Sequence, residues 1–166
     1  MTPQTESPTA RAPHLCFRSS PRPPACAREG GLGRVAVFGF LPRRERVPQV
    51  RHAVTGLLGY WGVGSDLRDT AALAVSELTA NAVLHAPAST SITVLIEVAS
   101  HLHIEVRDGS RQLPALQTPD GDDGESEHGR GLALVAALCS EWGTTVYGDG
   151  GKSVWAHFPL PRATEC

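Results

Sequence analysis

The sequence contains no long apolar run and no marked excess of charge of either sign. No stretch approaches the roughly 18 to 20 apolar residues that a membrane-spanning helix needs, and none resembles a signal-peptide core. The 15 Lys and Arg residues and 17 Asp and Glu residues give a net charge of −2, which argues against a polybasic nucleic-acid binder. With 41% hydrophobic residues, the chain is not compositionally disordered. We therefore expect a folded cytoplasmic protein that binds neither nucleic acid nor membrane directly.

Cysteine is scarce as well. The four cysteines include no Cys-x-x-Cys pair, so neither a zinc site nor a disulfide framework is indicated. Cys139 lies at helical spacing in an apolar stretch and is expected to be a small core side chain. Seven histidines are scattered along the chain, and the closest pair, His101 and His103, falls on one face of a predicted strand. That pair alone is weak evidence for a metal site.

Proline is unevenly distributed, because six of the 13 prolines lie within the first 24 residues. Such a segment cannot offset its ordering entropy by burial. We predict a flexible tail at 1–34, a single domain at 35–160 and a short C-terminal tail at 161–166. The N-terminal tail is interpreted as a solvated linker, with a basic docking arm as the alternative.

Apolar periodicity predicts the order of elements in the domain. The expected elements are a strand at 35–40, helices at 48–61 and 65–85, a β-hairpin at 92–98 and 102–106, a helix at 132–142, and strands at 144–147 and 153–158. The aperiodic segment 109–128 is predicted to be a mobile lid. This order predicts an α/β (α+β) two-layer sandwich, with helices on one face of a mixed, largely antiparallel sheet.

Three polar residues of the predicted second helix form the first chemical signal. Glu77, Asn81 and His85 are spaced i, i+4 and i+8, which places them along one side of the helix. A solvated helix face would show the same spacing. In a site, an Asn amide oxygen suits Mg²⁺ bound to phosphates, and a Glu one turn away could accept a proton from a hydroxyl group.

The second signal is an acid and a glycine at the end of a predicted strand, in Val106-Arg107-Asp108-Gly109-Ser110. A carboxylate in this position can accept a hydrogen bond from an exocyclic amine. An ordinary turn-forming Asp-Gly pair is the alternative.

The third signal is Gly129-Arg130-Gly131-Leu132, where the predicted lid meets a helix. Free N–H groups and the dipole of a helix N-terminus favour bound anions, and glycines let a phosphate approach the backbone. Leu134 stands where a dinucleotide-binding fingerprint needs its third glycine, and no P-loop sequence is present. Both of those nucleotide folds are therefore excluded.

Together the three signals resemble the GHKL superfamily, whose ATP-binding fold, the Bergerat fold, is shared by histidine-kinase catalytic domains, type II topoisomerases and heat-shock chaperones. The bacterial anti-sigma-factor serine/threonine kinases resemble the chain most closely. The resemblance covers about residues 35–160. Its most specific parts are Glu-Leu-x-x-Asn-Ala-x-x-His-Ala and Gly-Arg-Gly-Leu, with further matches at Trp142-Gly143 and in residues 151–156.

This resemblance implies ATP and Mg²⁺ as cofactors and suggests a role for each matching residue. Asn81 would be the magnesium ligand, Glu77 the general base, and Asp108 the residue that binds the adenine amine. The remaining implied nucleotide contacts are His85, Gly109, Gly129, Arg130, Gly131, Leu132 and Lys152. Two features depart from the family pattern: the glycine follows Asp108 directly, where the family often has Asp-x-Gly, and the lid is acidic with Arg111 as its one cation.

The resemblance implies an anti-sigma regulatory factor that sequesters a sigma factor and phosphorylates an antagonist protein on serine or threonine. It is also compatible with a homodimer. A non-catalytic module, in which ATP only creates a protein-binding surface, is the alternative. A further alternative is a detached histidine-kinase catalytic domain. The sequence after His52 lacks the acid and Thr-Pro or Ser-Pro context expected of a phospho-acceptor.

Overall fold

Five strands form one sheet in the computed structural model, which describes residues 33–86, 90–114, 130–148 and 150–161. The elements in chain order are β1 (Arg34–Phe40), α1 (Arg46–Tyr60), α2 (Ser65–His85), β2 (Ile92–Val98), β3 (His101–Asp108), α3 (Arg130–Leu138), β4 (Glu141–Val146) and β5 (Lys152–Pro159). The predicted tail at 1–34 and the predicted lid at 109–128 lie largely outside these residues. None of the described helices is long and apolar enough to cross a bilayer.

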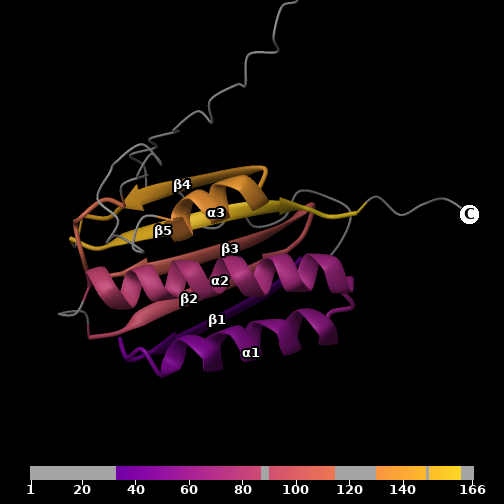
Figure 1. The fold of residues 1–166 in the computed structure, drawn as a ribbon, viewed down its shortest axis with the longest axis horizontal. Coiled ribbons are helices and arrows are strands. Elements are labelled where there is room, and N and C mark those ends of the chain that lie inside the picture. Colours follow the sequence, from indigo (N-terminus) through magenta and orange to yellow (C-terminus); the bar gives the residue numbers. More distant parts are fainter. Residues whose placement is uncertain (1–32, 87–89, 115–129, 149, 162–166) are drawn as a thin grey trace, which may run out of the picture.

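The strand order is β1-β2-β3-β5-β4, and each pairing is antiparallel. The three helices lie on one face of the sheet (Figure 1). The predicted two-layer α+β sandwich is thus confirmed. Where a mixed sheet was expected, the described strands form an antiparallel one, because β5 returns between β3 and β4 and runs opposite to both.

The core lies between the sheet and α2. Residues of β2 and β3 alternate, so that every second residue faces the helices, and all of these are buried except the half-buried Val98. These sheet residues are Ile92, Val94, Ile96, Leu102, Ile104 and Val106, and they share a core with Ala71, Ala74, Val75, Leu78 and Ala82 of α2. Full burial of one such aliphatic side chain contributes about 1.5–3 kcal/mol. Small alanines on α2 let the helix approach the sheet closely.

The predicted bounds of the first and last helices differ from the structure. Helix α1 begins at Arg46, two residues before Pro48, because proline is tolerated within the first turn of a helix. The last helix was predicted to continue to Trp142, and this was wrong: α3 ends at Leu138 and Trp142 lies in β4, paired with Ala156. Pairing with β5 overrides the helical periodicity of the apolar residues there.

The register of the sheet gathers several predicted site residues at one end. Asp108 at the end of β3 pairs with Lys152 at the start of β5, and Thr93 near the start of β2 pairs with Arg107. Helix α2 ends at His85, shortly before β2 begins. The C-terminal end of α2, the end of β3 and the start of β5 therefore lie at the same edge of the molecule (Figure 1).

Candidate functional site

Helix α2 carries Glu77, Asn81 and His85 in a line, as the spacing predicted. All three are half-buried, whereas Leu73 and Ala80 on the same helix are exposed. A fully solvated helix face would leave the polar residues exposed instead. The three side chains are therefore partly covered by the rest of the domain.

The first and third motifs meet at Glu77 and Gly131. A Cβ added at Gly131 would overlap the Glu77 carboxylate and would come within 3.2 Å of its carboxyl carbon, Cδ. With glycine at 131 the first turn of α3 can approach this side chain, whereas a larger residue there would require the Glu77 carboxylate to shift. A carboxylate is also favourable near the positive end of a helix. The contact brings the predicted general base against the predicted phosphate-binding segment, which the sequence could not show.

The second motif is organised by an ion pair between Asp108 and Lys152. The Lys152 ammonium donates hydrogen bonds of 2.9 Å to both carboxylate oxygens of Asp108, and the two side chains are only 1% and 2% exposed. Lys152 is the one lysine in the chain. In this structure its charge is directed at the predicted adenine-binding carboxylate. The implied contact of Lys152 with the nucleotide stays a prediction.

The turn after β3 holds Asp108 in place, although Asp108-Gly109-Ser110 departs from the Asp-x-Gly pattern of the family that it resembles. The backbone N–H of Ser110 donates a 2.8 Å hydrogen bond to Asp108 Oδ1, and the Ser110 hydroxyl accepts one of 3.1 Å from the N–H of Gln112. Such side-chain bonds replace backbone bonds in tight turns. Gly109 is exposed between them. The carboxylate is thus held by both a side chain and a backbone amide.

The remaining predicted residues fall in different places. Leu132 is 8% exposed and packs in the core, so its side chain supports α3. Arg130 is the first residue of α3, but its side chain lies outside the described part of the structure. Gly129 lies outside the described residues altogether. Arg111, the predicted lid cation, lies against the turn before β5, with its Nε 3.0 Å from where a Cβ of Gly150 would be.

Sequence analysis did not single out the polar network on the sheet face that the helices leave uncovered. Tyr147 donates a 2.9 Å hydrogen bond to Glu105, and the Arg107 guanidinium lies 4.0 Å from the centre of the Tyr147 ring. Burial would raise the pKa of Glu105, but hydrogen bonds from His103, Ser153 and Tyr147 outweigh it and hold the pKa below 4.5. The alternating polar residues of β3 are the signal that could have located this network.

A shallow apolar pocket of about 330 Å³ lies at the other end of the sheet. Its lining residues are Asp66, Leu67, Thr70, Leu138, Phe158, Pro159, Leu160 and Pro161. They come from the start of α2, the end of α3, and the end of β5 with the two residues after it, whereas Asp108 and Lys152 lie where β3 ends and β5 begins. The pocket is therefore separate from the candidate site.

Residues 40–158 match the family model described as a histidine kinase-like ATPase domain. Because the match covers more than half of the 166 residues, the chain belongs to this family. An ATP-binding function is what that family implies. The chain has no significant match among curated protein sequences.

Two of the solved structures that share the fold illustrate the similarity. One is the crystal structure of the RsbU and RsbW domains of Rv1364c from Mycobacterium tuberculosis, with a TM-score of 0.60 and 22% identity over 78% of this chain and 33% of that one. The other is the SiaB-SiaC complex from Pseudomonas aeruginosa, with a TM-score of 0.55 and 16% identity over 74% of this chain and 88% of that one. This chain thus spans about one third of the mycobacterial protein chain.

The residues present fit a nucleotide with its magnesium ion. Asn81 offers a half-buried amide oxygen, a hard ligand of the kind that Mg²⁺ accepts beside phosphate oxygens. Asp108 offers a buried carboxylate whose charge is balanced by Lys152. Helix α3 begins at the same site, as the contact of Gly131 with Glu77 shows, and the N-terminus of a helix favours a bound anion.

Proposed function

We propose that the chain is an ATP-dependent serine/threonine protein kinase that acts on a partner protein. The observation that carries the proposal is the position of Glu77, a carboxylate one helical turn from the amide of Asn81 and in contact with the start of α3 at Gly131. A proton acceptor is thereby held between a metal-binding side chain and an anion-binding helix end. This is the set of groups that phosphoryl transfer to a hydroxyl requires.

Each residue has one task in this proposal. Asn81 holds the magnesium ion, which when bound offsets the charge that develops on the phosphates. Glu77 accepts the proton of the partner's hydroxyl as that oxygen takes the terminal phosphoryl group and ADP leaves. Asp108 accepts a hydrogen bond from the adenine amine, and Lys152 fixes the orientation of that carboxylate. Gly131 leaves room for Glu77.

We further propose that the phosphorylated partner is an anti-sigma-factor antagonist and that the chain also sequesters a sigma factor. Support comes from the resemblance of its motifs to anti-sigma-factor kinases and from its fold, which is similar to structures that include an RsbW domain and a SiaB-SiaC complex. The sequence resemblance supports the roles proposed for the residues, and the structural similarity supports the fold.

The test of catalysis is transfer of label from γ-labelled ATP to a candidate antagonist. Glu77→Gln removes the proton acceptor with little change in shape, and we expect the rate to fall about 10²–10⁴-fold while ATP still binds. Asp69→Asn is the matched control, since Asp69 is an exposed acid on the same helix. Undiminished transfer by Glu77→Gln would contradict the general-base role.

The test of the nucleotide site is calorimetry with Mg-ATP. Asn81→Ala should weaken Mg-ATP binding strongly, whereas Thr70→Ala near the start of α2 should not. Unchanged affinity in Asn81→Ala would overturn the magnesium assignment. Tight ATP binding by the wild-type protein with no transfer to any antagonist would instead favour a non-catalytic, ATP-gated binding module.

A further inference from the structure

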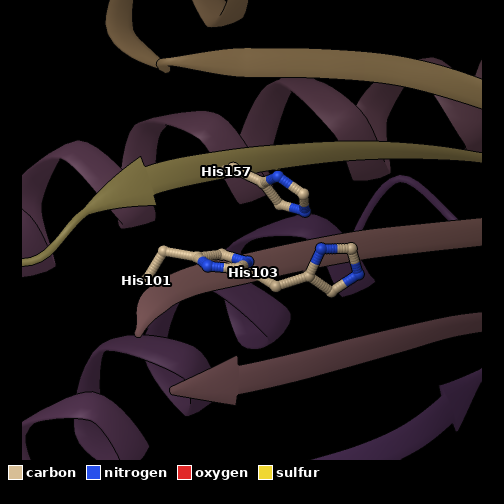
Figure 2. Close-up of side chains that lie close together, drawn as sticks. All are labelled: His101, His103 and His157. Carbon is tan, nitrogen blue, oxygen red and sulfur yellow. The ribbon is translucent and has the colours of Figure 1, made fainter. Parts of the chain in front are cut away.

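Three histidines gather on the sheet face opposite the helices, away from the proposed nucleotide site. His101 and His103 lie two residues apart on β3 and therefore share a face, and His157 on β5 is the direct cross-strand partner of His103. The three side chains are half-buried. Figure 2 shows their rings converging from the two neighbouring strands.

The spacing of the three rings is that of a metal-binding group. The ring centres of His101 and His157 are 4.3 Å apart, and those of His103 and His157 are 4.9 Å apart. One nitrogen from each ring can be chosen so that all three lie within 4.8 Å of one another. Around a tetrahedral ion with Zn–N bonds of about 2.0–2.1 Å, such nitrogens lie about 3.3 Å apart. Small side-chain rotations would close the difference without moving the strands.

Two carboxylates already orient two of these rings. His103 Nε2 lies 3.2 Å from Glu105 Oε2, and His157 Nδ1 lies 3.4 Å from Glu141 Oε2. A histidine that binds a metal usually gives its other ring nitrogen to a carboxylate in this way, which fixes the tautomer. The arrangement therefore leaves His103 Nδ1 and His157 Nε2 for an ion.

The ring of His101 also has a polar partner. His101 Nδ1 lies 3.1 Å from the hydroxyl oxygen of Ser100, which leaves Nε2. Among the described residues, these three histidines are the group of metal-ligating side chains that lies within such a distance.

We propose that His101, His103 and His157 form a binding site for a divalent transition-metal ion such as Zn²⁺. The ion would take three imidazole nitrogens and keep a fourth position for water, with Glu105 and Glu141 as positioning residues that orient His103 and His157. Imidazole ligands suit Zn²⁺, Cu²⁺ and Ni²⁺ and do not suit Mg²⁺. The site is therefore chemically distinct from the magnesium site proposed at Asn81, and it does not rest on the proposed kinase function.

The test is Zn²⁺ binding by the full-length, chelator-treated protein, measured by competition with a chromophoric chelator. We expect the wild-type chain to bind one equivalent that His103→Gln and His157→Gln each lose. The control is His52→Gln, because His52 is exposed on α1 outside the cluster. Glu141→Gln keeps all three imidazoles and should weaken binding only about 10–100-fold.

A second readout keeps the test independent of folding. Co²⁺ bound by three imidazoles gives visible d–d absorption, which should appear with the wild-type protein and with His52→Gln and be absent with His101→Gln. Far-UV circular dichroism shows whether each variant keeps its sheet. The proposal is overturned if the wild-type protein binds no equivalent of Zn²⁺, or if the same equivalent persists in folded His103→Gln and His157→Gln.

Discussion

Replacement of Lys152 by methionine tests how the buried ion pair holds the nucleotide end of the domain. Methionine keeps much of the length of the side chain and removes the ammonium group. The carboxylate of Asp108 then loses two hydrogen bonds of 2.9 Å in a place where it is 2% exposed. With so little of the carboxylate exposed, water replaces these bonds poorly, so the loss approaches the desolvation penalty of a buried charge.

The expected magnitude follows from that geometry. Breaking a buried pair by removing one partner costs about 3–5 kcal/mol. Typical domains are stable by about 5–15 kcal/mol, so Lys152→Met should lower the melting temperature by about 10 °C or more. Exposed Arg51→Met on α1 is the matched control and should change stability by no more than about 0.5 kcal/mol.

The assay is urea unfolding followed by tryptophan fluorescence and far-UV circular dichroism, with Asp108→Leu and the double variant completing a double-mutant cycle. Removing both charges leaves no buried ion unpaired, so the double variant should be more stable than Lys152→Met alone. The reasoning is refuted if Lys152→Met unfolds within about 1 kcal/mol of the wild type, or if the double variant is less stable than both single variants.

The same variant separates two roles for Lys152 in nucleotide binding. If the lysine acts on the adenine base by orienting Asp108, Lys152→Met should weaken ATP binding and ADP binding by the same factor. If it contacted the terminal phosphate, the loss would be greater for ATP. Calorimetry with both nucleotides under conditions where the variant is folded decides between these roles.

Three further changes should have measurable effects. Gly131→Ala should reduce phosphoryl transfer by displacing Glu77, whereas Gly56→Ala, where a Cβ meets no atom within 4 Å, should leave the rate unchanged; equal rates would contradict the close packing. Acylation of Lys152, the chain's one lysine, should be much slower in the folded protein than in urea, as peptide mass spectrometry would show. Burial raises the pKa of the Cys139 thiol above 9.0. In a variant whose other three cysteines are replaced by serine, alkylation of Cys139 at pH 8 should therefore be faster in the unfolded protein than in the folded one. Equal rates of alkylation would refute this.

Local sequence patterns were sufficient to predict most of the fold. An apolar stripe and a following proline predicted the second helix and its end near His85, as observed. Its start was less exact, because Ser65 or Asp66 was expected to be the cap and the structure has Gly64 in that position. The hairpin of β2 and β3 followed from strict alternation. Trp142 was placed wrongly because an apolar run between a helix and a strand fits both periods, and only the pairing with Ala156 decides between them.

The site residues were proposed one motif at a time, and their mutual contacts came only from the structure. Asp108 and Lys152 are 44 residues apart, and no local pattern indicates that they pair. The position of Glu77 against Gly131 likewise depends on the packing of α2 against α3. Periodicity assigns a residue to a face of its own element, but the partner across the interface is set by tertiary packing.

One feature of the sheet links the proposed nucleotide and metal sites. Asp108 pairs with Lys152 and His103 pairs with His157 in the same β3–β5 register, at positions that face opposite sides of the sheet. A register shift of two residues would preserve which face each side chain occupies, yet it would separate both pairs at once. An ion held by His103 and His157 would therefore stabilise the register that also places Lys152 on Asp108. Zn²⁺ should then slow hydrogen exchange of the backbone amides of β5 near Lys152 in the wild-type protein and have no such effect in His157→Gln.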